Sequence, residues 1–296
     1  MTGGEGMRLR EVWQKGKALL ETAGIPDVNF ELGLLFEHTF CYNRVDLLEK
    51  GEEEAGEAAC GAFFAAVERR RGGYPLQYIL GEWEFYGLPF FVGEGVLAPR
   101  ADTERLVEIC LERMAGREEP QVLELCSGSG CIAVALEKHL PGGEITAVEK
   151  SERAYGYLLR NLARHGSRVK PVLADALDYE PPGEYDLIAA NPPYVGEGER
   201  GLLSAETAYE PPEALFAGED GLLFYRALTA RYVPALREGG VLAYEIGYAQ
   251  GGAVAEILRE AGLGDVRVEK DYGGNDRVVS GKKQDGGKGL SACEGE

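Results

Sequence analysis

The sequence has too few basic residues for a protein that holds DNA mainly through its phosphates. It contains 31 lysines and arginines but 50 aspartates and glutamates, which gives a formal net charge of -19 over 296 residues. Phosphate binding of that kind requires Lys and Arg gathered on one surface. The acidic balance is typical of a solvated surface or of a protein with a basic protein partner. We therefore expect no direct nucleic-acid partner.

The spacings of a metal site and the long apolar run of a membrane span are also absent. The six cysteines include no Cys-x-x-Cys pair, and the three histidines lie apart from them, so we predict no metal site. No run of about 18 apolar residues occurs, and the start of the chain shows no secretory hydrophobic segment. We expect a cytoplasmic monomer with reduced thiols and no membrane attachment.

Apolar periodicity changes along the chain and predicts two domains. Residues 1–73 carry apolar residues at helical spacing, which predicts a small helical domain. Residues 74–97 combine aromatic and β-branched residues with glycines, which predicts a β-hairpin linker. In residues 98–281 strand and helix patterns alternate, which predicts an α/β domain with a mostly parallel sheet and helices on both faces. Residues 282–296 lack periodicity and are expected to be disordered.

The same alternation sets the expected elements of the α/β domain. The predicted strands are residues 121–125, 144–149, 169–177, 185–190 and 240–246. The predicted helices are residues 131–139, 151–165, 221–236 and 249–261. The last two strands, 266–268 and 277–280, have no helix between them, so we expect an antiparallel pair at an edge of the sheet.

A loop containing two glycines follows the strand at residues 121–125. Its sequence is Cys126-Ser127-Gly128-Ser129-Gly130, and a helix follows, so flexible backbone lies where a ligand approaches a helix N-terminus. The spacing Gly128-x-Gly130-x-x-Ala133 also satisfies the dinucleotide fingerprint, and Glu149 stands at about the 20-residue offset of a ribose-binding acid. Taken alone, this loop is compatible with NAD or with S-adenosylmethionine.

Two acidic residues favour S-adenosylmethionine. Glu124, within the strand before the loop, suits a ligand that carries an ammonium group better than one that carries a pyrophosphate. Asp175, at the end of the third predicted strand, offers an acceptor for an adenine amino group. Each residue also has an alternative, purely structural role. Glu124 could be a carboxylate that caps backbone amides, and Asp175 could be a turn or N-cap residue.

The strand at residues 185–190 delivers Asn191-Pro192-Pro193-Tyr194 at its carboxyl end, where open α/β sheets bind their ligands. The prolines restrict the backbone and remove N–H groups, so the loop is rigid and poor in donors. It presents the Asn191 carboxamide oxygen and the Pro192 carbonyl as acceptors, and the Tyr194 ring as an aromatic face.

Two acceptors beside an aromatic ring match a planar group that carries one NH2. An amide or aromatic amine is a weak nucleophile because its lone pair is delocalised. Fixing both N–H bonds would turn that lone pair toward a sulfonium methyl, and the proton can leave after the nitrogen has become cationic. The alternative is a proline-rich turn after a strand, which the glycine loop two strands earlier argues against.

These two loops, in this order, resemble those of the amino-methyltransferases with an Asn-Pro-Pro-Tyr motif, which include adenine-N6 DNA methyltransferases and protein glutamine-N5 methyltransferases. Further motifs resemble the bacterial release factor glutamine methyltransferases, the HemK/PrmC family. They are Tyr74-Pro75-Leu76-Gln77-Tyr78-Ile79-Leu80-Gly81, Glu84-Phe85-Tyr86-Gly87, Leu97-Ala98-Pro99-Arg100-Ala101-Asp102-Thr103-Glu104, Tyr244-Glu245-Ile246-Gly247 and Asp271-Tyr272-Gly273-Gly274-Asn275-Asp276-Arg277.

The resemblance implies a Rossmann-like class I methyltransferase fold and methyl transfer to the glutamine of the Gly-Gly-Gln motif in class I peptide chain release factors. It implies that the N-terminal helical domain helps to hold this partner. The implied cofactor-binding residues are Cys126, Ser127, Gly128, Ser129, Gly130, Glu149, Asp175, Ala176 and Asn191. The implied substrate-binding residues are Asn191, Pro192, Pro193 and Tyr194, with Phe85 and Arg100 lining the pocket.

The sequence departs from the family at position 126, where Cys126 stands in place of the usual glycine. A side chain there would crowd the cofactor if the backbone needs a positive φ.

Among alternative functions, an adenine-N6 DNA methyltransferase would share both loops but would need a basic surface and a target-recognition segment. An NAD-dependent oxidoreductase would need only the glycine loop, so that function does not account for residues 191–194. A non-catalytic binding module would not need a rigid pair of acceptors beside a cofactor loop.

Overall fold

The computed structural model describes residues 6–284. These residues form two compact units. The first, which we call the helical unit, contains residues 6–83, 92–94 and 204–209; the second, the sheet unit, contains residues 84–91, 95–203 and 210–284. No helix in residues 6–284 is long and apolar enough to cross a membrane.

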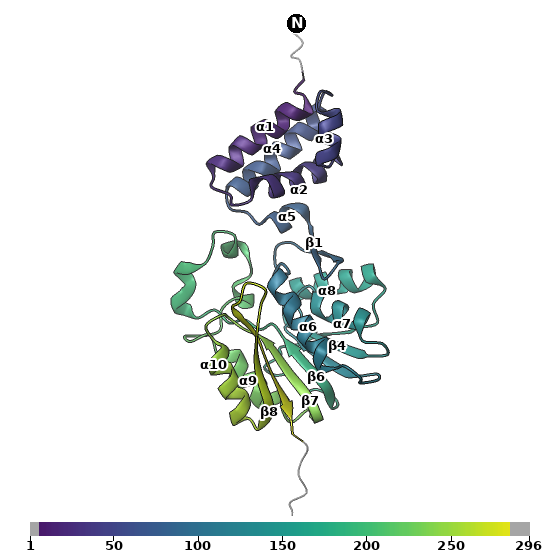
Figure 1. Cartoon of the computed structure of the whole chain (residues 1–296), viewed down its shortest axis with the longest axis vertical. Coiled ribbons are helices and arrows are strands. Elements are labelled where there is room, and N and C mark those ends of the chain that lie inside the picture. Colours follow the sequence, from purple (N-terminus) through teal and green to yellow (C-terminus); the bar gives the residue numbers. More distant parts are fainter. Residues whose placement is uncertain (1–5, 285–296) are drawn as a thin grey trace, which may run out of the picture. The chain divides into compact units, whose positions relative to one another are not determined.

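The helical unit is built from α1 to α5 (Figure 1). Its helices are α1 (Leu9–Thr22), α2 (Val28–Phe40), α3 (Arg44–Lys50), α4 (Glu57–Arg71) and α5 (Leu76–Leu80). The Asp27 side chain accepts a hydrogen bond from the Phe30 amide and so caps α2, and Asn43 caps α3 in the same way. Phe36 of α2 and Phe63 of α4 are buried, and their rings meet edge to face at 5.6 Å. Aromatic packing of this kind confirms the predicted helical core.

A short segment from far along the chain, residues 204–209, completes the helical unit. The Arg70 side chain is buried and forms ion pairs with Glu31 and with Glu206, the latter at 2.6 Å. The ring of Tyr209 packs edge to face against that of Tyr74 at 5.1 Å. The sequence patterns did not predict this insertion, because residues 204–209 have no apolar periodicity of their own.

The predicted β-hairpin is present as β1 (Glu82–Phe85) and β2 (Leu88–Phe91), which form a two-stranded sheet. Between them Tyr86 and Gly87 have φ values of 54° and 71°, the conformation of a type I′ turn. The prediction placed the whole of residues 74–97 in the hairpin, but residues 76–80 form α5. Gly81, with φ 76°, ends that helix.

The sheet unit contains a seven-stranded sheet of order β5-β4-β3-β6-β7-β9-β8. Its strands are β3 (Gln121–Leu125), β4 (Glu144–Glu149), β5 (Lys170–Leu173), β6 (Tyr185–Ala190), β7 (Leu236–Glu245), β8 (Leu263–Lys270) and β9 (Asp276–Lys283). β5, β4, β3, β6 and β7 are parallel, whereas β9 runs antiparallel to both β7 and β8. The mostly parallel sheet with an antiparallel edge is therefore confirmed.

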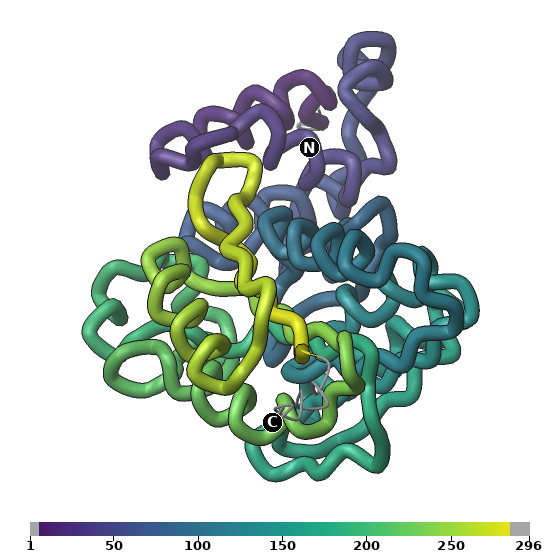
Figure 2. Tube along the Cα trace, turned by 60° about the horizontal axis from the view of Figure 1, so that its bottom comes forward, coloured from purple at the N-terminus to yellow at the C-terminus, as the bar shows by residue number. Residues whose placement is uncertain are grey.

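Helices cover both faces of this sheet (Figure 1). They are α6 (Glu104–Arg113), α7 (Cys131–His139) and α8 (Glu152–His165) on one face, and α9 (Leu223–Tyr232) and α10 (Gly251–Glu260) on the other. Successive residues of β6 point to opposite faces, so Leu187 joins the first core and Ile188 the second. Figure 2 traces the C-terminal strands β8 and β9, in yellow, beside α10.

Several element boundaries differ from the prediction. β5 ends at Leu173, so Asp175 lies in the turn beyond the strand instead of at its end. α9 ends at Tyr232, because the residue before Pro234 is disfavoured in a helix, and β7 already begins at Leu236. β9 continues to Lys283 by pairing with β7 and β8, which corrects the expected start of a disordered tail at residue 282. Residues 285–296 of that predicted tail lie outside the described residues, and α6 was not predicted.

Candidate active site

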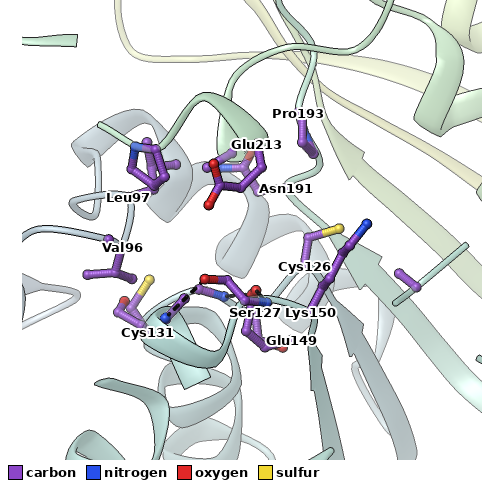
Figure 3. Close-up of a pocket in the computed structure, with 18 of the residues that line it drawn as sticks. Val96, Leu97, Cys126, Ser127, Cys131, Glu149, Lys150, Asn191, Pro193 and Glu213 are labelled. Carbon is purple, nitrogen blue, oxygen red and sulfur yellow. Dashed lines mark hydrogen bonds between the residues drawn. The ribbon is translucent and has the colours of Figure 1, made fainter. Parts of the chain in front are cut away.

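A cavity of about 400 Å³ opens in the sheet unit at the carboxyl ends of β3, β4 and β6 (Figure 3). Parallel α/β sheets bind their ligands at this edge, and the volume suits a small cofactor. The lining residues are Gly95, Val96, Leu97, Ala98, Pro99, Arg100, Thr103, Cys126, Ser127, Gly128, Ser129, Cys131, Val148, Glu149, Lys150, Ser151, Ala154, Asp175, Ala176, Asn191, Pro193, Pro211, Glu213, Ala214 and Phe224.

The loop after β3 lines one wall of this cavity with backbone in the left-handed region. Cys126, Gly128 and Gly130 have φ values of 57°, 54° and 79°. A Cβ at Gly130 would lie 2.4 Å from Cδ1 of Leu158, so only glycine lets α8 pack this closely. We expected a side chain at residue 126 to crowd the cofactor if the backbone there has a positive φ. Cys126 does have a positive φ, and it lines the cavity. Burial raises the pKa of its thiol, which therefore stays protonated near neutral pH.

Glu149, the last residue of β4, organises this loop. One carboxylate oxygen accepts a hydrogen bond from the Gly128 amide and the other from the Ser151 amide, both at 2.7 Å. Burial raises the pKa of Glu149, while these hydrogen bonds oppose the shift. Each oxygen retains a second lone pair, so a ligand hydroxyl fits beside the loop that Glu149 holds.

Asp175 lines the cavity from the turn after β5. Its Oδ2 lies 2.7 Å from Nζ of Lys150, and its Oδ1 accepts a hydrogen bond from the Leu177 amide at 2.9 Å. Burial of Asp175 disfavours its charge, but the hydrogen bonds and the Lys150 charge outweigh it and lower the pKa. Asp175 therefore makes the hydrogen bond expected of a turn residue, and it also lines the cavity.

Glu124 is fully buried and does not line the cavity. Among the described residues, neither of its carboxylate oxygens has a hydrogen-bond partner. Burial, reinforced by the nearby Glu149, raises its pKa to about 8. Gly130 also lies outside the lining, so its contribution is to the shape of the loop.

The loop after β6 brings Asn191 and Pro193 to the cavity, whereas Pro192 and Tyr194 do not line it. Nδ2 of Asn191 donates to Oγ1 of Thr103 at 3.4 Å. Burial raises the pKa of Tyr194 to about 12, so its hydroxyl is neutral at physiological pH. The Tyr194 carbonyl accepts a hydrogen bond from Nε2 of Gln250 at 2.9 Å, and Gln250 also accepts from the Gly247 amide. The loop is thus anchored from the side of α10.

Arg100 lines the cavity and pairs at 2.6 Å with Glu210, whose side chain is almost fully buried. Glu210 also accepts a hydrogen bond from the Ala98 amide. This pair holds the connection that starts at Pro211 against the cavity wall. Phe85, also expected to line the pocket, is instead buried in the hydrophobic core beside Phe90.

Several lining residues were not predicted, and they complete the electrostatics of the cavity. Glu213, from the connection before α9, extends its carboxylate into the cavity on the same side as Asn191 and opposite Ser127 (Figure 3). Its charge contributes to the raised pKa of Glu149. Lys150 could have been found from its position directly after Glu149, but Glu213 has no sequence signal because only the tertiary fold brings it here.

The charges favour a cationic ligand. Glu149 and Glu213 face the cavity as carboxylates, while both lining cations are paired, Lys150 with Asp175 and Arg100 with Glu210. A pyrophosphate would need cations or amides free to neutralise it, whereas a sulfonium and an ammonium group fit beside carboxylates. The residues therefore fit S-adenosylmethionine better than a dinucleotide.

Comparisons with known proteins identify the family of the chain. The chain matches the PrmC N-terminal domain over residues 11–81 and the methyltransferase small domain over residues 101–214. It is 37% identical to a release factor glutamine methyltransferase of Fusobacterium nucleatum, covering 92% of this chain and 78% of that protein. It is 38% identical to the protein of that name from Geobacter sulfurreducens, covering 93% of this chain and 96% of the relative.

Among solved structures, a methyltransferase from Pyrococcus furiosus has a TM-score of 0.51 at 21% identity, covering 68% of this chain and 91% of that one. This likeness concerns the fold, a class I methyltransferase sheet. The protein is a methyltransferase with S-adenosylmethionine as its cofactor. The chain belongs to the release factor glutamine methyltransferase family.

Proposed function

We propose that this enzyme transfers the methyl group of S-adenosylmethionine to a protein glutamine, at the side-chain nitrogen of the Gly-Gly-Gln motif in class I peptide chain release factors. The observation that carries the proposal is the position of Asn191. It lines the cofactor-sized cavity from a loop with two prolines, and its amide nitrogen donates a hydrogen bond to Thr103. The relatives at 37% and 38% identity are named release factor glutamine methyltransferases, which supports the coarser part of the proposal.

In this proposal the cofactor is held by residues 126–130, Glu149, the Asp175-Ala176 turn and Asn191. S-adenosylmethionine supplies an electrophilic methyl group on a sulfonium. Glu149 accepts hydrogen bonds from ribose hydroxyls with the lone pairs that Gly128 and Ser151 leave open. Glu124, expected among these residues, is buried behind the loop and does not line the cavity.

The glutamine amide is held by residues 191–194. The Asn191 Oδ1 and the Pro192 carbonyl accept its two N–H bonds, and the Tyr194 ring flanks its plane. Fixing both hydrogens aims the nitrogen lone pair at the methyl group, which lowers the entropic part of the barrier. No base is needed before transfer, because the proton leaves once the nitrogen has become cationic. Arg100 completes the pocket wall through its pair with Glu210.

The proposed protein partner assigns a role to each of the two compact units. We propose that the helical unit is a substrate-recognition domain and that the sheet unit is the catalytic domain; the expected bounds 1–73, 74–97 and 98–281 give way to those of the two units.

The test is methyl transfer from S-adenosylmethionine labelled in its methyl group. The enzyme is incubated with an intact class I release factor, with the same factor carrying Glu in place of the motif glutamine, and with duplex DNA. We expect label in the first sample alone. Label in the DNA, or equal label in both release factors, would reject the proposed acceptor.

A further inference from the structure

We propose that Gln250 is a positioning residue for methyl transfer, which fixes the peptide bond after Tyr194 and so holds residues 191–194 in the shape that receives the acceptor. The inference rests on the proposed function, in which this loop clasps the substrate amide. Gln250 does not line the cavity, so it acts through the loop and not by contact with the reactants.

The Gln250 side chain is bonded to three segments of the sheet unit that are distant from one another in the sequence. Gln250 stands directly before α10, and its Nε2 donates to the carbonyl of Tyr194 at 2.9 Å and to that of Gly221 at 3.3 Å. Its Oε1 accepts from the Gly247 amide at 2.9 Å. Tyr194 follows β6, Gly247 follows β7 and Gly221 precedes α9. One side-chain amide therefore joins the ends of two neighbouring strands to the connection that carries Glu213.

The direction of this side-chain amide is fixed, because each partner is a backbone group with a single role. The Gly247 amide can only donate, so it faces Oε1, and the carbonyls of Tyr194 and Gly221 can only accept, so they face Nε2. Turning the amide over would bring donor against donor and oxygen against two carbonyls. Residues 247–250 also form a turn in which the Gln250 backbone amide donates to the Gly247 carbonyl at 2.9 Å. Both the position and the direction of the side chain are thereby defined.

The peptide bond after Tyr194 is held from both sides. Its carbonyl accepts from Gln250, and its amide, that of Val195, donates to the carbonyl of Leu215 at 2.8 Å. The two prolines restrict the loop before Tyr194, and these two hydrogen bonds restrict it after Tyr194. The Tyr194 ring, which is proposed to flank the acceptor, therefore stands on backbone that is restricted in both directions.

Gly221 shows how closely these segments approach. Its φ is 71°, and a Cβ there would overlap the carbonyl oxygen of Tyr194 and lie 2.7 Å from Nε2 of Gln250. Only glycine leaves room for the hydrogen bond between those two residues. Gly218, in the same connection, has a similar φ of 77°, but a Cβ there would meet nothing closer than 3.5 Å. The two glycines share a backbone conformation and differ in their contact with the Gln250 hydrogen bond.

The first test is Gln250→Met, which keeps the side-chain length and removes its donors and its acceptor. We expect kcat to fall about tenfold and the cofactor Kd to stay within about twofold, because the lost hydrogen bonds restrain the acceptor loop and not the cofactor loop. Thr229→Val is the control, since Thr229 is buried, bonds to the Tyr244 hydroxyl at 3.2 Å and does not line the cavity. Equal kcat in the two variants, or a tenfold rise in cofactor Kd in Gln250→Met, would overturn the inference.

Gln250→Glu gives a pH-dependent readout. The ionised carboxylate still accepts from the Gly247 amide, but its other oxygen repels the carbonyls of Tyr194 and Gly221, whereas the neutral acid donates to one of them. These carbonyls favour the neutral form, so the ratio of kcat in the variant to kcat in the wild type should rise about threefold or more from pH 8 to pH 6. The ratio removes the pH dependence of the wild-type enzyme. A purely structural defect leaves it flat, and a flat ratio would reject the positioning role.

The two glycines test the same hydrogen bond from its other side. Gly221→Ala and Gly218→Ala each add a methyl group at a positive φ, so both should lose stability. Only Gly221→Ala displaces the Tyr194 carbonyl, so we expect its kcat to fall about tenfold, against less than about twofold in Gly218→Ala. Chemical denaturation identifies conditions under which both are folded, and equal kcat under those conditions would contradict the inference.

A last readout does not depend on the acceptor. Hydrogen exchange of the Val195 backbone amide reports on the peptide bond that Gln250 holds, and it should be about tenfold faster in Gln250→Met than in Thr229→Val. Equal exchange in these variants overturns the inference whatever the substrate. Failure of the wild-type enzyme to label a release factor overturns the proposed function instead, so the two failures are distinguishable.

Discussion

The two loops at the cavity follow neighbouring parallel strands, β3 and β6, but they hold their shape in different ways. The loop after β3 uses positive φ at Cys126, Gly128 and Gly130 and is fastened by a single carboxylate, Glu149. The loop after β6 is restricted by two prolines, and its Asn191 side chain donates a hydrogen bond to Thr103 of another element. The first loop depends on backbone freedom and the second on side chains contributed by other elements. Substitutions in the first should therefore change cofactor binding, and those in the second should change turnover.

The largest effect is expected from Asn191→Ala. It removes the acceptor for the substrate NH2, so kcat should fall about 100-fold or more, as for other groups that bind a reacting centre. Because Asn191 is one of many lining residues, the cofactor Kd measured by calorimetry should rise only a few-fold. Unchanged kcat in Asn191→Ala would contradict the expectation that the loop after β6 controls turnover and the loop after β3 controls cofactor binding.

Glu149→Ala should produce the opposite pattern. It removes the acceptor for two backbone amides and the proposed ribose contact, so the cofactor Kd should rise about 10-fold to 100-fold. With saturating cofactor, kcat should recover much of its value. A normal Kd in this variant would contradict the role of Glu149, and calorimetric titration with S-adenosylmethionine decides it.

Gly130→Ala tests the backbone requirement of the first loop. The added methyl group would meet Leu158 in a residue with φ 79°, so we expect unfolding free energy to fall by about 2 kcal/mol or more. Gly116→Ala is the matched control, because its φ is 81° but nothing lies within 4 Å of a new Cβ. That variant should lose only about 1 kcal/mol from backbone strain. Equal losses in chemical denaturation would show that contact with Leu158 is unimportant.

The smallest effect is expected from Cys126→Gly, which relieves a positive φ of 57° and removes a cavity-lining thiol. Unfolding free energy should rise by about 0.5 to 1 kcal/mol, and the cofactor Kd should change. Cys41→Gly provides the control, since Cys41 also has φ 57° but ends α2 in the helical unit. It should give a similar gain in stability with an unchanged Kd. A Kd that responds equally to both substitutions would refute a local effect of Cys126.

Several expectations could be derived from sequence because they depend on near neighbours. Both loops follow strands whose boundaries, residues 121–125 and 185–190, were predicted correctly, since buried parallel strands are short apolar runs. Glu149 was identified from its offset to the glycines. Glu124 was also identified as a candidate. Its burial away from the cavity was not predicted, because the exposure of a strand residue depends on which helices cover the strand.

By itself, the sequence determined the parallel sheet, the flexible loop at one strand end and the donor-poor loop at another. These properties follow from periodicity, glycine and proline, which act within a few residues. Only the tertiary structure decided that Glu213 faces the cavity, that residues 204–209 join the helical unit, and that Thr103 contacts Asn191. Such contacts join segments that are distant along the chain, and their hydrogen-bond directions depend on burial and charge that no local pattern records.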